Sequence, residues 1–315
     1  MDPVSDYQNS YQNSDHPAMR SGGCGRLRDE VALGPFELVE TSGEIIDIQR
    51  TFAPKPFWAV VFIKLILTGV CVDRIVRDLI LYDDETRYFY FAYLTHWGLI
   101  CSIIFMLLST INTLMPYPEQ QGRGMSASVL VKLAWAFFPL AATVEAVVVM
   151  LYWALDYQSG IPVSYANFMK HGGIFVIVLL EGLVVDRVPI RLYHVRYPMI
   201  LALAYGIWSA VHGLLTDIGN PVDGGEDDAI YPTMNWEVRP ISSLVKALIA
   251  LFLLTPFFFI IIYALSYPMR RYVSSDTMSG RSSQSTTSTI STRSAWNDIS
   301  RFRPKGRQNA AVQSV

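Results

Sequence analysis

Nine polar side chains lie within long apolar stretches of this 315-residue sequence, where an ionisable group is costly. They are Lys64, Thr95, His96, Lys132, Glu145, Lys170, His171, Glu181 and His212. In an apolar setting such groups usually face the interior of a helix bundle, in pairs or beside a cavity. They are therefore the first residues to consider for function.

The combination of a threonine, Thr95, and a histidine, His171, in two apolar runs indicates nucleophilic catalysis. An alcohol is a weak nucleophile, and a neighbouring imidazole that accepts its proton activates it. Thr95 is the eighth residue of its apolar run and His171 the sixth of its own. At about 1.5 Å per residue, both are predicted roughly 10 Å below the same surface. We therefore expect a hydroxyl and an imidazole from different helices to share one site.

Three further residues are candidates for orienting contacts or for contacts to an oxyanion. They are Asn167, Tyr205 and His212, which share helical faces with other polar residues of their runs. Glu181 follows His171 by ten residues, about 15 Å along a helix, so no triad role is predicted for it. Small residues in line with Thr95, such as Ser102 and Ser109, also suit close packing between helices.

Other chemistries have weaker support in the sequence. His96 and His171 are a conceivable haem pair, but at 100° per residue His96 points away from Thr95. Lys64, Glu145 and Glu181 would suit a transport relay, although the internal repeats common in transporters are absent from the sequence. The sequence contains no G-x-S-x-G, P-loop, G-x-G-x-x-G or H-E-x-x-H motif. We therefore predict no cofactor and no metal.

The composition is that of a membrane protein. Apolar residues make up 51% of the chain and charged residues only 17%, below the roughly 25% of average soluble proteins. The net charge of −2 favours no nucleic-acid partner, and the predicted partners are membrane lipids. Apolar runs long enough to cross a bilayer recur along the chain. They cover residues 57–72, 88–115, 127–155, 166–185, 195–215 and 244–266.

These runs predict an all-α fold, a polytopic membrane bundle of about six transmembrane helices. The first run is short, but the i,i+4 pairs Asp73/Arg77 and Arg74/Asp78 would let its helix continue with paired charges. The predicted domains are a disordered tail over 1–54, the six-span domain over 55–267 and a Ser/Thr/Arg-rich disordered tail over 268–315.

The distribution of basic residues predicts the orientation. Eight Lys or Arg residues and only two acids follow Ser266, whereas the connection 216–243 holds six acids and only Arg239. Lys and Arg favour the cytosolic side, so the C-terminal tail is predicted to be cytosolic. An even number of spans places the N-terminal tail there too. The membrane is predicted to be the plasma membrane or the endoplasmic reticulum.

Four segments of the sequence resemble the Rolling stone proteins, which are similar to the androgen-induced family of six-span membrane proteins. The segments are YFYFAYLTHWGL (88–99), NFMKHGG (167–173), VPIRLYHVRYP (188–198) and AIYPTMNWEVRP (229–240). The resemblance covers roughly residues 50–267 and neither tail.

The resemblance implies two readings of the function. Some androgen-induced relatives are intramembrane threonine hydrolases that cleave fatty acid esters of hydroxy fatty acids, and their nucleophile and histidine would correspond to Thr95 and His171. A lipid ester would then be the substrate. The Rolling stone branch is associated with cell fusion in muscle development, which instead implies a non-enzymatic scaffold or signalling protein in adhesion, fusion or trafficking.

Overall fold

The computed structural model describes residues 48–52, 57–81, 89–115, 128–157, 162–215 and 229–268. All of them belong to one compact unit, Met1–Val273. The second unit, Ser274–Val315, lies outside the described residues, as do most of the predicted N-terminal tail and the acidic stretch 216–228. Within that tail, Ile48–Phe52 forms a short 3₁₀ turn, η1, with Ile48 and Phe52 in the core.

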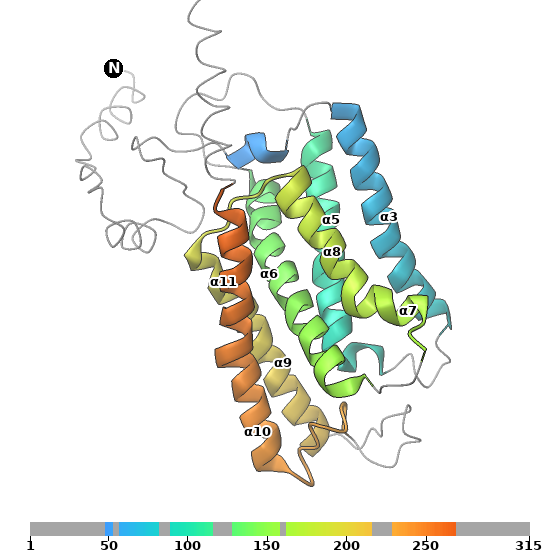
Figure 1. Ribbon diagram of the computed structural model, residues 1–315, viewed down its shortest axis with the longest axis vertical. Helices are drawn as coiled ribbons and strands as arrows, with labels where there is room; N and C mark the ends of the chain where they lie inside the picture. The colour runs from blue at the N-terminus through green and yellow to red at the C-terminus, as the bar shows by residue number, and fades with distance from the viewer. Residues whose placement is uncertain are drawn as a thin grey trace, which may run out of the picture. The chain divides into compact units, whose positions relative to one another are not determined.

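Among the described residues, six long helical segments form the bundle (Figure 1). The first three are α3 (Phe57–Leu81), α5 (Leu94–Leu114) and α6 (Val129–Leu151), which the π turn η3 (Tyr152–Asp156) continues. The fourth segment, Tyr165–Val185, consists of α7 (Tyr165–Phe168), η4 (Met169–Gly173), α8 (Ile174–Leu179) and η5 (Leu180–Val185). The fifth joins η6 (Leu192–Val195) to α9 (Arg196–Leu215). The sixth joins α10 (Pro240–Ile249), η7 (Ala250–Leu254) and α11 (Thr255–Ser266).

The predicted all-α membrane bundle is confirmed. Five of the described helical segments are long and apolar enough to cross a membrane. The sixth, α3, has 25 residues and carries more charge, but its i,i+4 pairs form as predicted, with 2.7 Å between Arg77 Nε and Asp73 Oδ2. The start of α3 and the end of α11 lie at the same end of the bundle (Figure 1).

Two predicted helix starts were wrong. The second span was predicted from residue 88, but Tyr90–Ala92 forms the 3₁₀ turn η2 and Tyr93 is extended (φ −84°, ψ 135°), so α5 begins at Leu94. The last span was predicted from residue 244, but its helix begins at Pro240. Proline is favoured at the first turn of a helix, where its missing N–H has no helical partner to lose.

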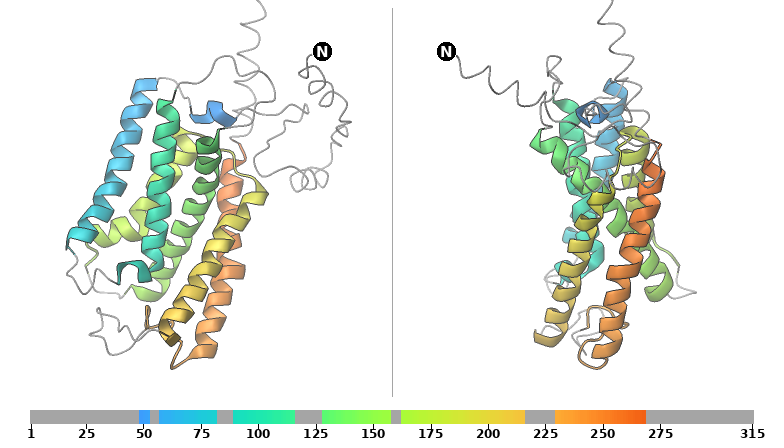
Figure 2. Two further views of the ribbon diagram at one scale, coloured as in Figure 1. Left: turned by 180° about the vertical axis from the view of Figure 1, so that it is seen from behind. Right: turned by 90° about the vertical axis from the view of Figure 1, so that its left-hand side faces the viewer.

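Helix α6 is the centre of the bundle. It contacts α5, α8, α9 and α11, and α9 and α11 lie side by side in both views of Figure 2. Trp135 and Phe138 are fully buried on α6, and the Trp135 indole donates a hydrogen bond to the carbonyl of Pro189 (2.6 Å). Gly182 of the fourth segment lies so close to Phe138 that a Cβ there would be 2.0 Å from the ring. Glycine is therefore what allows these two segments to approach.

Candidate functional site

A cavity of about 580 Å³ lies at the end of the bundle where α5 begins and α6 ends. Its wall comes from α5, α6, the fourth segment, α9, the α10–η7 junction and residues 230–234. Its volume falls within the roughly 300–1,000 Å³ typical of small-molecule sites. The cavity is therefore large enough for a ligand rather than for a few water molecules.

Thr95 lies on the wall of this cavity as the second residue of α5. It is 9% exposed, and among the described residues its hydroxyl forms no hydrogen bond. The segment before it is held from outside α5, because the Leu94 N–H donates to the Tyr231 hydroxyl (3.1 Å). The predicted depth of eight residues into the span was wrong for Thr95, since η2 and the extended Tyr93 replace the first turns of that span.

His171 lies on the same wall, in the π turn η4. Its backbone leaves the helical region there (φ −114°, ψ 22°), and its carbonyl accepts a hydrogen bond from the Trp153 indole (2.8 Å). The ring stacks on Tyr152 with 3.5 Å between centroids and 5° between planes. Its Nδ1 is buried and has no hydrogen-bond partner among the described residues. The ring is thus fixed in orientation, and its Nδ1 is enclosed without a hydrogen-bond partner among the described residues.

The structure brings Thr95 and His171 to one cavity from different helices. No direct hydrogen bond joins the two side chains within the part of the chain that the structure describes. Catalytic hydrogen bonds are often long or absent before a substrate is bound.

The three supporting candidates do not all lie at the cavity. Asn167 and Tyr205 line the cavity, whereas His212 does not, because its ring packs against Phe89 (5.1 Å between centroids) and Trp208 (5.8 Å). The Tyr205 hydroxyl donates to the Ala92 carbonyl (2.9 Å), so Tyr205 anchors the segment before Thr95. Asn167 opens the fourth segment, where its N–H donates to the Ser164 hydroxyl that caps α7 (3.2 Å).

A cluster of charged residues around Asp78 lies beside the cavity and was not predicted from the sequence. Lys170 Nζ lies 3.0 Å from Asp78 Oδ1, and Arg74 bonds to the same carboxylate. His96 Nε2 is 4.0 Å from Asp78 Oδ2, and the His96 ring stacks on Tyr90 at 3.7 Å. The sequence had indicated Asp78 only as the i,i+4 partner of Arg74. Its link to Lys170 joins α3 to the fourth segment and depends on tertiary packing.

Much of the remaining wall is apolar. The end of α6 contributes Val144, Val147, Val148 and Leu151, and Ile230 faces them from the loop before α10. The wall therefore offers a ligand a hydroxyl, an imidazole and an amide together with aliphatic side chains. This combination suits a molecule with a polar reactive group and a long apolar part.

The comparisons with known proteins agree with this architecture. The family model described as protein rolling stone matches residues 55–283. The curated protein named "Protein rolling stone" from Drosophila melanogaster is 23% identical over 198 residues, which cover 58% of this chain and 68% of the relative. No solved structure matches the chain. Because the family match spans the whole described bundle from α3 to α11, the chain belongs to the rolling stone family.

Proposed function

We propose that the chain is an intramembrane hydrolase of lipid esters, with Thr95 as nucleophile and His171 as general base and then general acid. The observation that supports this most is that an unbonded threonine hydroxyl and an imidazole with an unpartnered nitrogen line one cavity of about 580 Å³. A weak nucleophile and a base within reach of it are what acyl transfer requires.

The reaction has two halves. His171 removes the proton from Thr95 Oγ1 as that oxygen attacks the ester carbonyl carbon, and the C–O bond to the alcohol breaks when the imidazolium returns the proton to the leaving oxygen. The acyl-threonine is then attacked by water, which gives its proton to His171. The threonine Oγ1 leaves with that proton, and the acid is released.

The negative charge that develops on the carbonyl oxygen needs a hydrogen-bond donor to stabilise it. Asn167 is the candidate, because it lines the cavity one turn before His171, while the Tyr205 hydroxyl is already bonded to Ala92. The aliphatic part of the wall, for example Val147 and Leu151, favours a substrate with a long acyl chain that enters from the bilayer.

The proposed setting is the plasma membrane or the endoplasmic reticulum, with both termini in the cytosol. The excess of Arg after Ser266 supports this orientation, as does the position of the start of α3 and the end of α11 at one end of the bundle (Figure 1). A glycosylation acceptor inserted into the connection 216–228 should be glycosylated, and one added to either terminus should not. The opposite pattern would reverse the orientation.

The purified protein should hydrolyse a long-chain fatty acid ester, and Thr95→Val should lower the rate by about 1,000-fold or more. Thr143→Val is the matched control, because it removes a buried hydroxyl that has no partner among the described residues and lies away from the cavity. Thr95→Ser should keep part of the activity. His171→Ala should lower the rate about 100- to 10,000-fold with insertion and folding retained.

Two outcomes would count against the hydrolase. Equal activity in the Thr95→Val and wild-type proteins would remove Thr95 as the nucleophile. No hydrolysis by a folded wild-type protein across ester classes would favour the non-enzymatic reading, a scaffold or signalling protein in adhesion, fusion or trafficking.

A further inference from the structure

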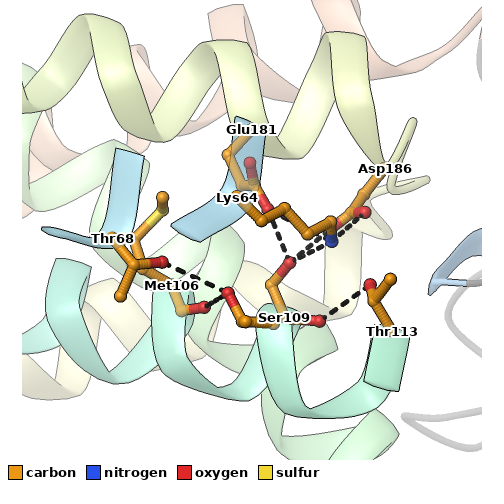
Figure 3. Close-up of polar contacts among 8 residues, drawn as sticks. Lys64, Thr68, Met106, Ser109, Thr113, Glu181 and Asp186 are labelled. Carbon is orange, nitrogen blue, oxygen red and sulfur yellow. Dashed lines mark hydrogen bonds and ion pairs between the residues drawn. The ribbon is translucent and has the colours of Figure 1, made fainter. Parts of the chain in front are cut away.

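A second polar cluster lies at the opposite end of α5 from Thr95, and none of it belongs to the proposed hydrolase site (Figure 3). Lys64 of α3, Ser109 of α5, Glu181 of η5 and Asp186 make up this ion cluster, and the side chains of Lys64, Glu181 and Asp186 are completely buried. Lys64 Nζ lies 3.1 Å from Glu181 Oε1 and 2.5 Å from Asp186 Oδ1. Two carboxyl groups therefore share one ammonium group without solvent.

The contacts of Ser109 reveal how many protons the ion cluster holds. Its Oγ lies 2.8 Å from Glu181 Oε1 and 2.6 Å from Asp186 Oδ2, and it accepts a hydrogen bond from Lys64 Nζ (2.5 Å). An oxygen–oxygen contact this short needs a proton between the atoms. A hydroxyl carries only one proton, so it donates to one carboxyl group, and the other must bring a proton of its own.

We infer that Glu181 and Asp186 together bind one exchangeable proton, which makes the packing of α3, α5 and the fourth segment dependent on pH. With that proton, every contact has a donor. Lys64 donates to Ser109 and to both carboxyl groups, Ser109 donates to one of these, and the other donates to Ser109. The charges also balance, since one ammonium group faces one carboxylate in a site where an unpaired charge is very costly.

The second carboxyl oxygen of Glu181 also supports the shared proton. Glu181 Oε2 is buried and has no hydrogen-bond partner among the described residues, although Oε1 has two. Among the described residues, Lys64 is the cation that forms ion pairs with Glu181 and Asp186. Cys71 of α3 is close enough to Glu181 and to Glu145 of α6 for an electrostatic interaction, but neither Cys71 nor Glu145 brings a positive charge. Lys64 alone therefore leaves one negative charge to be neutralised.

The backbone explains why Asp186 reaches this position. It follows the π turn η5 directly, and its N–H donates to the Glu181 carbonyl (2.9 Å). Arg187 then adopts a left-handed conformation (φ 55°), and the Val188 N–H returns to the Gly182 carbonyl (2.7 Å). This closing turn ends the segment and directs Asp186 back towards Lys64.

The sign of the pH dependence follows from Asp186, which lies just beyond the fourth span. Burial raises the pKa of this carboxyl group above that of a solvated one; Lys64 acts against that effect and Glu181 adds to it. The folded protein therefore keeps a proton that the unfolded chain releases. Stability is highest in acid and falls as the pH rises above the ordinary carboxyl range of about 4.

Infrared difference spectroscopy on the purified protein tests the proton directly. The wild-type protein should show the C=O stretching band of a protonated carboxyl group that disappears as the pH is raised. On a Glu145→Gln background, Asp186→Asn and Glu181→Gln should each lose this band, because the remaining carboxylate balances Lys64. Glu145→Gln is the matched control, since it removes a buried carboxyl group outside the ion cluster and should leave the band in place.

Thermal unfolding gives the second readout. The Tm of the wild-type protein should fall with rising pH, and Asp186→Asn should flatten this dependence because an amide N–H replaces the acid O–H towards Ser109. The proposal is overturned if the Glu145→Gln protein shows no protonated carboxyl band at neutral pH. It is also overturned if the band persists unchanged in both cluster variants, or if the pH dependence of Tm is the same in all of them.

Discussion

The two ends of α5 hold polar groups in opposite ways. At its start, Thr95 faces a cavity, and its hydroxyl has no hydrogen bond among the described residues. Fourteen residues later, about 21 Å along the helix, Ser109 contacts Lys64, Glu181 and Asp186 in a site closed to solvent (Figure 3). One end leaves its polar groups available to a ligand, whereas the other uses them to join helices.

The fourth segment supplies residues to both ends, and each lies in a π turn. His171 is in η4 beside the cavity, and Glu181 is in η5 beside Lys64. A π turn inserts an extra residue per turn and rotates the side chains that follow, and such turns occur often at functional sites. His171 and Glu181 are ten residues apart, about 15 Å along the segment, so one segment supplies a residue to each end of the bundle. The difference predicts that substitutions in the ion cluster reduce stability, while those at the cavity change activity.

The largest effect is expected for Lys64→Met. Removing the single ammonium group from the ion cluster leaves two buried carboxyl groups without a cation and should lower the unfolding free energy by about 3–5 kcal/mol. Lys170→Met is the matched substitution at the cavity end, where the side chain is 14% exposed and Arg74 still pairs with Asp78. It should cost clearly less in a thermal unfolding assay. Equal losses of stability in Lys64→Met and Lys170→Met would show that the ion cluster is no more important for stability than the cavity end.

A smaller effect is expected where the fourth segment meets α6. A Cβ at Gly182 would lie 2.0 Å from the Phe138 ring, so Gly182→Ala should destabilise the protein by about 1–3 kcal/mol. Gly69→Ala is the control, because no atom lies within 4 Å of its added Cβ and alanine favours a helix by up to about 1 kcal/mol. Denaturation of the two variants side by side should give opposite signs. A Gly182→Ala protein as stable as the wild type would contradict the close approach.

The smallest effect is expected for Thr143→Val. The Thr143 hydroxyl is buried and has no partner among the described residues, so an isosteric methyl group removes no hydrogen bond. The unfolding free energy should change by less than about 1 kcal/mol, or rise. A large loss would reveal a hydrogen bond to Thr143 that the structure does not show, and would disqualify it as a control for Thr95.

The sequence was sufficient for the fold because hydropathy reports directly on the bilayer. Four of the six predicted spans required little or no change, and the ion pairs of α3 formed at the predicted i,i+4 spacing. The start of α5 was missed because Tyr90 to Tyr93 carry no charge, proline or glycine that would mark a break before the helix. Their departure from helix depends on contacts such as Tyr205 to Ala92 and Tyr231 to Leu94, which are distant in sequence.

The sites were less predictable. The distance of Glu181 from the cavity was predicted from its ten-residue offset from His171, but the π turns η4 and η5 in which the two residues lie were not. Ser109 was interpreted as a small residue for helix packing, since nothing in the sequence shows that Lys64 and Asp186 converge on it. His212 was proposed from its place on α9, which gave no information on the aromatic rings around it.

The most direct test of the catalytic cavity is to identify the residue that reacts with a fluorophosphonate probe, by peptide mass spectrometry of the labelled, purified protein. The adduct is predicted on Thr95 Oγ1, with labelling lost in Thr95→Val, retained in Thr143→Val and strongly slowed in His171→Ala. An adduct on another residue, or undiminished labelling of Thr95→Val, would contradict the assignment of Thr95 as the nucleophile.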